Sequence, residues 1–231
     1  MTSGRDHVAL LTRGVSLPEK PLSIRHLGVI ADAICSAWGE VLAKWSDQAA
    51  TGLERDVNAA LISHLKIACR SPSPFRTLVA AVDRGTEDYN FDGTRIENRP
   101  DINFALTQRV SGFPFVGECK IIDAGSGRTV AKYDIQGLQR FVKGDYAWFN
   151  SQAVMIAYVR DATRIEDAIG RLTGSPPTRW PTGSGRHVMT SHGRTFGYID
   201  RGPDVASPGA IDVLHIWLDV PGPIARRPKT R

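Results

Sequence analysis

The chain has few cysteines and no long apolar run. Its 231 residues include Cys35, Cys69 and Cys119, an odd number too small for a disulfide framework. No stretch approaches the roughly 18 consecutive apolar residues of a membrane span. The apolar segment that ends at Leu11 is followed at once by polar residues and is too short for a secretory signal peptide. These absences predict a cytoplasmic protein without disulfides and without membrane contact.

The sequence also lacks a strong overall charge. The formal net charge is +5, and Arg226, Arg227, Lys229 and Arg231 in the last six residues supply most of it. This tail either contacts phosphates or is a solvated basic terminus. Hydrophobic content of 42% and charged content of 23% are typical of a globular chain, and the length fits one domain. Walker-type phosphate loops and GxGxxG motifs are absent, so the function has to be sought in other local motifs.

The hydrophobic periodicity predicts an α/β chain with a mixed central sheet. After a loosely ordered lead-in at 1–25, spacings of three and four residues predict one helix from His26 and a second from Thr51 to Ala68. Thr51 and Glu54 have the spacing of a capping box. The other expected elements are strands at 77–82, 101–106 and 113–122, a helix at 130–143, a strand at 153–159, a helix at 163–172 and a strand at 211–220. Within the segment 174–209, which is rich in proline and glycine, a hairpin is expected to turn at His192-Gly193.

Two polar clusters fall on segments that should form apolar strands. In Pro100-Asp101-Ile102-Asn103, the period of two places Asp101 and Asn103 on one face. In the segment 116–122, Glu118 and Lys120 share a face, and Cys119 points to the opposite, apolar face. Desolvating a carboxylate and an ammonium group within an apolar strand is costly. We therefore expect a shared, partly wet catalytic face.

Carboxylates on neighbouring strands can converge on one hard divalent cation. Mg²⁺ takes oxygen ligands, commonly one or two carboxylates together with water and substrate phosphate. Lys120 beside Asp101 and Glu118 would orient or help deprotonate an attacking water, or stabilise developing negative charge. The chemistry predicted is hydrolysis of a phosphodiester. The alternative is a structural Glu118–Lys120 pair, with Asp101 as a turn residue after Pro100.

The spacing of these residues resembles a family pattern. Pro100-Asp101, sixteen further residues and then Glu118-Cys119-Lys120 resemble the PD-(D/E)xK motif of restriction-endonuclease-like nucleases. The order of helix, three strands, helix and strand over residues 50–160 resembles their common core. The resemblance implies that Asp101, Glu118 and Lys120 are catalytic. It also implies that Asp101, Glu118 and the Cys119 carbonyl are ligands of Mg²⁺, with Mn²⁺ as a substitute.

In many members of this family a glutamate on the preceding helix also faces the metal ions. Glu54 stands in that place, and Glu40 stays open as an alternative. On this interpretation residues 1–231 form one nuclease domain. It would comprise a helical lead-in at 1–49, a catalytic core at 50–173, a β-rich C-terminal extension at 174–220 and a basic tail at 221–231.

Candidate nucleic-acid contacts follow the motif. Gln136, Arg140 and Lys143 lie at i, i+4 and i+7, opposite an expected apolar side with Ile135. The alternative is a solvated helix face. Some groups of the family carry Gln-x-x-x-Tyr on this helix, and here Arg140 stands in place of the tyrosine. Arg179 and Trp180 in the proline-rich segment can contact phosphates and stack on bases, or they can pack inward.

These features predict a Mg²⁺-dependent endonuclease that cuts DNA, with RNA left open as a substrate. The class suggests a restriction or anti-phage defence role, as a homodimer or within a larger defence complex. The alternatives are a catalytically idle nucleic-acid-binding or regulatory subunit on the same fold, and a structural subunit of an assembly.

Overall fold

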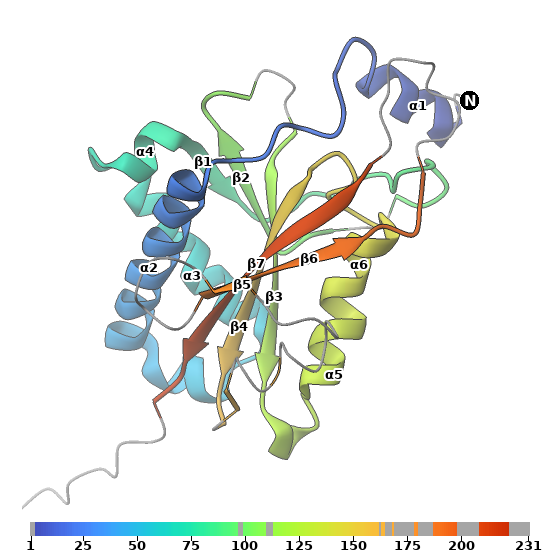
Figure 1. The fold of residues 1–231 in the computed structure, drawn as a ribbon. Helices are drawn as coiled ribbons and strands as arrows, with labels where there is room; N and C mark the ends of the chain where they lie inside the picture. The colour runs from blue at the N-terminus through green and yellow to red at the C-terminus, as the bar shows by residue number, and fades with distance from the viewer. Residues whose placement is uncertain are drawn as a thin grey trace, which may run out of the picture.

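The computed structural model describes residues 3–96, 99–109, 113–161, 163–164, 168, 178–179, 187–197 and 208–221. In these residues a mixed sheet is flanked by helices, as Figure 1 shows. The helices are α1 (Gly4–Leu11), α2 (Ile24–Thr51), α3 (Glu54–Ala68), α4 (Pro74–Leu78), α5 (Val130–Tyr133) and α6 (Gln139–Lys143). A π-helical turn, Asp134–Leu138, joins α5 to α6, and a 3-10 turn, Ala124–Ser126, precedes α5.

The described strands form one seven-stranded sheet in the order β1-β2-β3-β4-β7-β6-β5. They are β1 (Val79–Asp83), β2 (Ile102–Leu106), β3 (Phe115–Ile122), β4 (Gln152–Val159), β5 (Thr178–Arg179), β6 (His187–Gly193) and β7 (Ala210–Asp219). The neighbouring pairs β3–β4 and β4–β7 are parallel, and the other pairs are antiparallel. The mixed sheet expected from the sequence is thereby confirmed.

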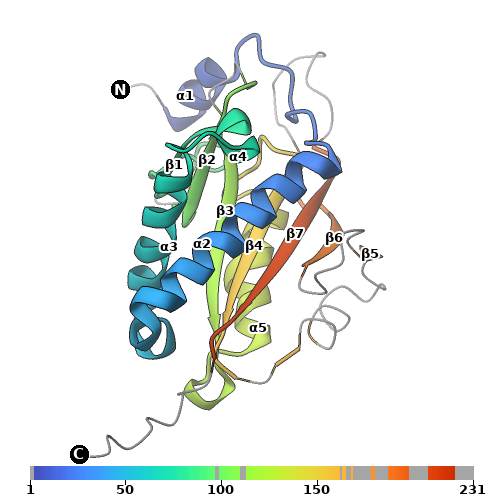
Figure 2. The same cartoon turned by 90° about the vertical axis from the view of Figure 1, so that its left-hand side faces the viewer.

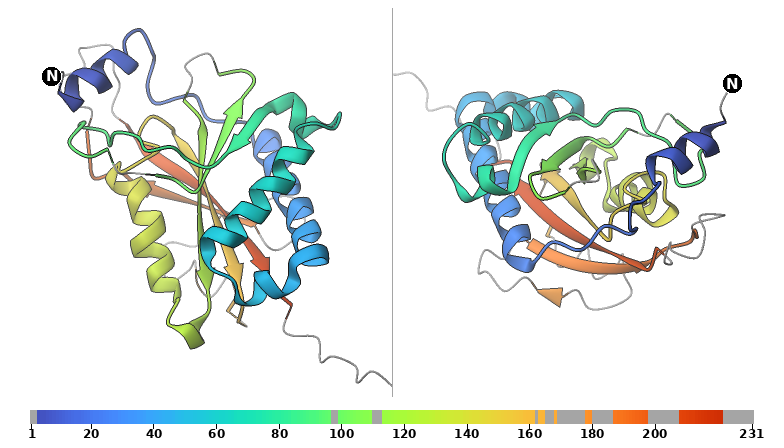
Figure 3. Two further views of the ribbon diagram at one scale, coloured as in Figure 1. Left: turned by 180° about the vertical axis from the view of Figure 1, so that it is seen from behind. Right: turned by 90° about the horizontal axis from the view of Figure 1, so that it is seen from above.

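The sheet separates two apolar layers. On one face, α2 and α3 pack against a core that includes Phe104, Cys119 and Tyr158. On the other face, α5 and α6 cover a second core that includes Tyr133 and Trp148. Figure 2 shows α2 and α3 in front of the strands, with α5 behind them, and the back and top views of Figure 3 agree. Because the central strands β3, β4 and β7 are covered on both faces, they are almost wholly buried.

Helix α2 is long and apolar enough, by length and composition, to cross a membrane. Its apolar stripe lies against the sheet, with Leu27, Ile30, Ile34 and Val41 buried in the core. The indole nitrogen of Trp38 donates a hydrogen bond to the Asp219 carbonyl at the end of β7. The apolar spacing that predicted this helix therefore reflects packing on the sheet.

Three local expectations are corrected. The segment expected to be loosely ordered contains α1, whose N-terminus has a capping box between Ser3 and Asp6. The hairpin expected at His192-Gly193 is wrong, because both residues continue β6, which pairs with β7 out to Gly193 opposite Ala210. The long strand β7 lies beside β4, so a segment expected as an extension contributes a central strand. The helix expected at 163–172 lies largely outside the described residues.

Candidate active site at the free edge of strand β3

Strands β2 and β3 separate where the polar residues begin. They pair only from Phe104 opposite Phe115 to Ile102 opposite Gly117, whereas β3 stays paired with β4 as far as Ile122. The part of β3 beyond Gly117 therefore has no β2 backbone beside it. Backbone N–H groups at such an edge need other acceptors, because unpaired buried donors are costly.

Two carboxylates accept these backbone donors. Asp101 Oδ2 accepts a hydrogen bond from Cys119 N at 2.8 Å, and Glu54 Oε2 accepts one from Ile121 N at 3.0 Å. Glu54 is the first residue of α3. The capping box expected for Thr51 is wrong, because Thr51 ends α2 and bonds back to the Asp47 carbonyl. Glu54 thus ties the start of α3 to the edge of β3.

The ammonium group of Lys120 lies between the carboxylates. Its Nζ is 2.7 Å from Glu118 Oε1, 3.2 Å from Glu54 Oε1 and 3.8 Å from Asp101 Oδ2. It also donates to the Cys119 carbonyl at 2.8 Å. The Lys120 side chain is 15% exposed and that of Glu118 is 2% exposed. The pair is therefore deeper in the protein than the partly wet face expected from the strand pattern.

The electrostatics of this cluster favour additional positive charge. Burial, and then the Glu118 carboxylate, raise the pKa of Asp101 to about 7, although Lys120 opposes the shift. Burial alone would lower the pKa of Lys120, but the charges of Glu118, Asp101 and Glu54 outweigh it and raise that pKa. One buried ammonium group thus faces three carboxyl groups, and one of these is hard to ionise.

Arg140 and Tyr146 form a second layer around Glu118. Arg140 Nη1 is 3.6 Å from Glu118 Oε1, and its guanidinium carbon lies 5.9 Å from the centre of the Tyr146 ring. Burial, and then the Glu118 charge, raise the pKa of the Tyr146 hydroxyl. Ala147, the next residue, has φ 52°, a strained value for a residue with a side chain. The sequence pattern did not indicate Tyr146, which reaches the site from the loop after α6.

A buried amide holds Asp101 from the opposite side. Asn58 Nδ2 donates to Asp101 Oδ1 at 2.9 Å, and Asn58 Oδ1 accepts from the Tyr158 hydroxyl at 2.9 Å. Asn58 is buried on α3. The sequence held a signal for it, because Asn58 falls four residues after Glu54 and three before Leu61, within the apolar stripe.

The helix that follows β3 exposes the residues expected to contact nucleic acid, Gln136, Arg140 and Lys143. Its expected apolar side is wrong in one place, since Ile135 is 64% exposed while Tyr133 is buried. The π-helical turn at Asp134–Leu138 explains this, because it holds more residues per turn than an α-helix, rotates less per residue and so shifts the phase of the helix. Of the three residues, Arg140 contacts the carboxylate cluster.

The other candidate residues lie apart from the cluster. Glu40, the alternative upstream glutamate, forms an exposed ion pair with Lys44 on α2. The backbone of Arg179 belongs to β5, and its side chain and Trp180 lie outside the described part of the chain. Cys119 is buried in the core, as expected, and takes part in the cluster through its backbone.

The donor set of the cluster fits a hard cation. The described residues contain no ready-made metal group of three His, Cys, Asp or Glu side chains, since the oxygens instead surround the Lys120 ammonium. All of these donors are carboxylate or carbonyl oxygens, which Mg²⁺ prefers. Glu118 Oε2 is buried without a hydrogen-bond partner in the described structure and is an acceptor ready for such an ion. Comparison with family models, curated proteins and solved structures gives no match to this chain.

Proposed function

We propose that this protein is a Mg²⁺-dependent nuclease that hydrolyses phosphodiester bonds of DNA. One observation carries the proposal: the carboxylates of Glu54, Asp101 and Glu118 and the carbonyl of Cys119 converge on the Lys120 ammonium at the free edge of β3. A purely structural ion pair would need one carboxylate for one ammonium group. Three carboxylates around a single buried lysine instead suit a site that takes up further cationic charge.

The topology supports a restriction-endonuclease-like core for this site. Helix α3 precedes the antiparallel strands β1, β2 and β3, the helical segment 130–143 follows, and β4 returns parallel to β3. This order is the one that the PD-(D/E)xK resemblance implies. The motif residues also stand where two antiparallel strands diverge.

The residues can be assigned separate roles. Asp101, Glu118, Glu54 and the Cys119 carbonyl would hold the ion, and a bound Mg²⁺ would supply a Lewis acid and an acidified water. Lys120 would then donate its hydrogen bonds to the attacking water or to a phosphate oxygen, where charge develops.

Neighbouring side chains support these roles. Asn58 keeps Asp101 in place through its 2.9 Å hydrogen bond. The exposed guanidinium group of Arg140 can bind a phosphate oxygen beside Glu118. Arg140 therefore links the carboxylate cluster to the outer surface of the helix, along which Gln136 and Lys143 are also exposed.

The proposal extends to an endonuclease in restriction or anti-phage defence, in the cytoplasm. Because one site cleaves one strand, cutting a duplex favours a homodimer, alone or in a larger defence complex. An idle DNA-binding or regulatory subunit on the same fold is the alternative, and RNA stays open as a substrate.

Incubation of plasmid DNA with the purified protein tests the proposal. We expect nicking or linearisation in Mg²⁺ or Mn²⁺, and none in Ca²⁺ or EDTA. Lys120→Ala should be inactive, and Lys132→Ala, which removes an exposed lysine from α5, should cut at the wild-type rate. Cleavage that persists in EDTA would refute the mechanism. DNA binding without any cleavage would favour the idle subunit.

A further inference from the structure

A cavity of about 510 Å³ lies next to the carboxylate cluster. Asn103 on β2 and Val116 on β3 lie opposite each other and both line it. Each is two residues from a cluster residue, Asn103 from Asp101, which directly precedes β2, and Val116 from Glu118 on β3. Residues two apart in a strand share a face and are separated by about 7 Å. The cavity therefore adjoins the site on the same face of the sheet.

Two polar atoms of the cavity lining have no partner. Asn103 Oδ1 and the Tyr146 hydroxyl are buried side-chain atoms without a hydrogen bond in the described structure, and both residues line the cavity. Tyr146 is 2% exposed. Tyr146 both lines the cavity and feels the charge of Glu118, whose Oε2 is also unpartnered. Buried polar atoms normally find partners, so this grouping points to a ligand with hydrogen-bonding groups.

One wall of the cavity is aromatic and suits a flat ring. Phe113 and Phe149, which are stacked with ring centres 4.4 Å apart, line it beside Tyr146. The cavity lining also holds three acidic residues, Asp83, Glu87 and Asp88, of which the first two are already paired. Asp83 lies 2.6 Å from Lys66, and Glu87 lies 3.4 Å from Arg99. Arg84 also lines the cavity and could meet a phosphate, whereas the aromatic wall and the Asn103 amide are the parts that an aromatic heterocycle could contact.

We infer that this cavity takes a single nucleobase of the strand at the cleavage site, so that the preferred substrate carries an unpaired base. The inference rests on the proposed nuclease function. A base inside a duplex cannot enter a protein cavity, so it has to be single-stranded, bulged or turned out of the stack. An exocyclic amine, as on adenine or cytosine, would donate to Asn103 Oδ1 once that amide turns into the cavity, while the phosphate of the same nucleotide would lie at the carboxylate cluster.

Binding can be tested without cleavage, in EDTA, with the full-length protein and DNA that carries 2-aminopurine. This fluorescent base has an exocyclic amine and loses emission when it stacks on aromatic rings. We expect the emission of a bulged 2-aminopurine to fall at least about twofold on binding, with little change for the paired base. Ala105→Phe should abolish the change, because Ala105 is exposed on β2 and lines the cavity. The matched control is Ala80→Phe, at an exposed position of β1 outside the lining, and it should behave as wild type.

Cleavage in Mg²⁺ gives the second measurement. A duplex with one bulged adenine should be cut about tenfold faster than the fully paired duplex, and Asn103→Ala should remove the preference for adenine over thymine at the bulge. Unchanged emission on wild-type binding, or the same change in Ala105→Phe, would overturn the inference. A selective emission change without any cleavage would support base binding in the cavity and contradict the nuclease function.

Discussion

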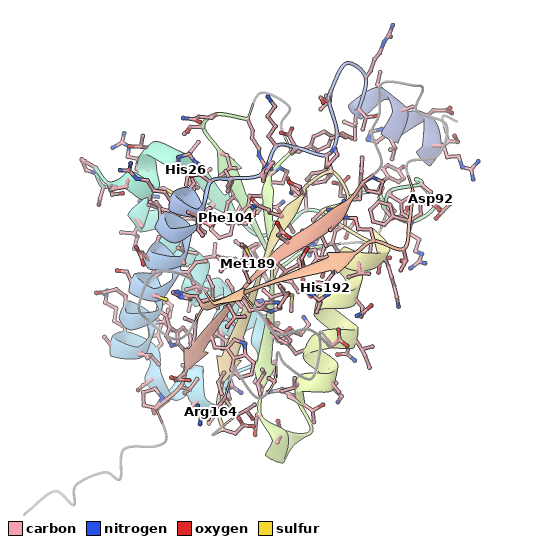
Figure 4. All side chains as sticks on the ribbon, in the orientation of Figure 1. His26, Asp92, Phe104, Arg164, Met189 and His192 are labelled. Atoms are coloured by element: carbon pink, nitrogen blue, oxygen red, sulfur yellow. The ribbon has the colours of Figure 1, made fainter. Side chains whose placement is uncertain are left out.

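Two buried polar clusters on opposite parts of the sheet are held in different ways. At the free edge of β3, three carboxylates lie within 4 Å of the Lys120 ammonium nitrogen. Between β6, β7 and α5, a neutral hydrogen-bonded network links Tyr133, His215, Thr190 and His192 in that order. The successive distances are 2.6, 2.8 and 2.7 Å. Figure 4 labels His192 on β6, toward the end of the strand nearer α6.

The comparison separates a structural network from a site. In the neutral network each of the two ring nitrogens of His215 has one partner, and burial lowers the pKa of that ring to about 3. In the charged cluster Glu118 Oε2 lacks a partner, and burial raises the pKa of Asp101 to about 7. A satisfied network needs no further partner, whereas a cluster with an unpartnered carboxylate oxygen can accept one more donor or cation, as the proposed function supposes.

The largest effect should come from removing the central cation. Lys120→Ala should reduce cleavage ~10²–10³-fold, because it loses the group that acts on the developing charge. It should also lower the free energy of unfolding by about 3–5 kcal/mol, since buried carboxylates lose their partner. Urea unfolding should show that Mg²⁺ recovers much of the stability of the variant but none of its activity. If Lys120→Ala were as stable and as active as Lys132→Ala, the charged cluster would not differ from the neutral network in the way described.

The stability that the neutral network contributes should be lost in acid. The unfolded state takes up a proton on His215 near pH 6.5, and the folded state does so only near pH 3, so stability falls as the pH drops through this window. The loss from this group should reach roughly 3 kcal/mol at pH 4. His215→Gln should flatten this part of the urea-derived stability profile, and His26→Gln on α2 should leave it unchanged. An unaltered profile in His215→Gln would show that the ring titrates normally.

The contribution of the charged cluster to folding stability should depend on pH in the opposite direction. The pKa of Asp101 is raised from 3.8 to about 7, so the folded state keeps a proton that the unfolded state has released. Stability therefore falls as the pH rises from about 4 to 7, by about 2 kcal/mol after allowance for the 24% exposure of the side chain. Asp101→Asn should remove this slope in metal-free buffer. A slope that is retained in the variant would contradict the assignment.

A smaller loss of stability is expected from a substitution within the neutral network. Tyr133→Phe removes the hydroxyl that bonds His215 Nδ1, and should lower the unfolding free energy by about 1–2 kcal/mol. Plasmid cleavage should proceed at the wild-type rate, because this network stabilises the fold and does not contact the carboxylate cluster. A loss of activity without a loss of stability would place Tyr133 in the catalytic machinery.

The smallest effect should come from the basic tail. Deletion of residues 226–231 removes four positive charges, and should weaken DNA binding modestly and flatten its dependence on salt. Fluorescence anisotropy across a salt series measures both quantities. The Mg²⁺ dependence of cleavage should be the same as in the full chain. An identical salt slope would show that the tail is a solvated terminus.

The sequence by itself determined the strands and the motif. Alternation with a period of two placed Asp101 beside Asn103 and Glu118 beside Lys120 on one face of each segment, and β2 and β3 form at those segments, with Asp101 directly before β2. These relations are local, because side-chain direction along a strand depends only on the parity of the position. The helical spacing likewise predicted most of α2 and α3.

Only the tertiary structure decided what surrounds the motif. Asn58 and Tyr146 reach the cluster from α3 and from the loop after α6, and the choice of Glu54 over Glu40 depends on how the helices dock on the sheet. The π-helical turn that exposes Ile135 and the placement of β7 beside β4 are also products of packing. Such contacts join residues far apart in the chain, and no local period encodes them. The sequence therefore specified the carboxylates and the lysine, and the fold determined how deeply they are buried and which groups they meet.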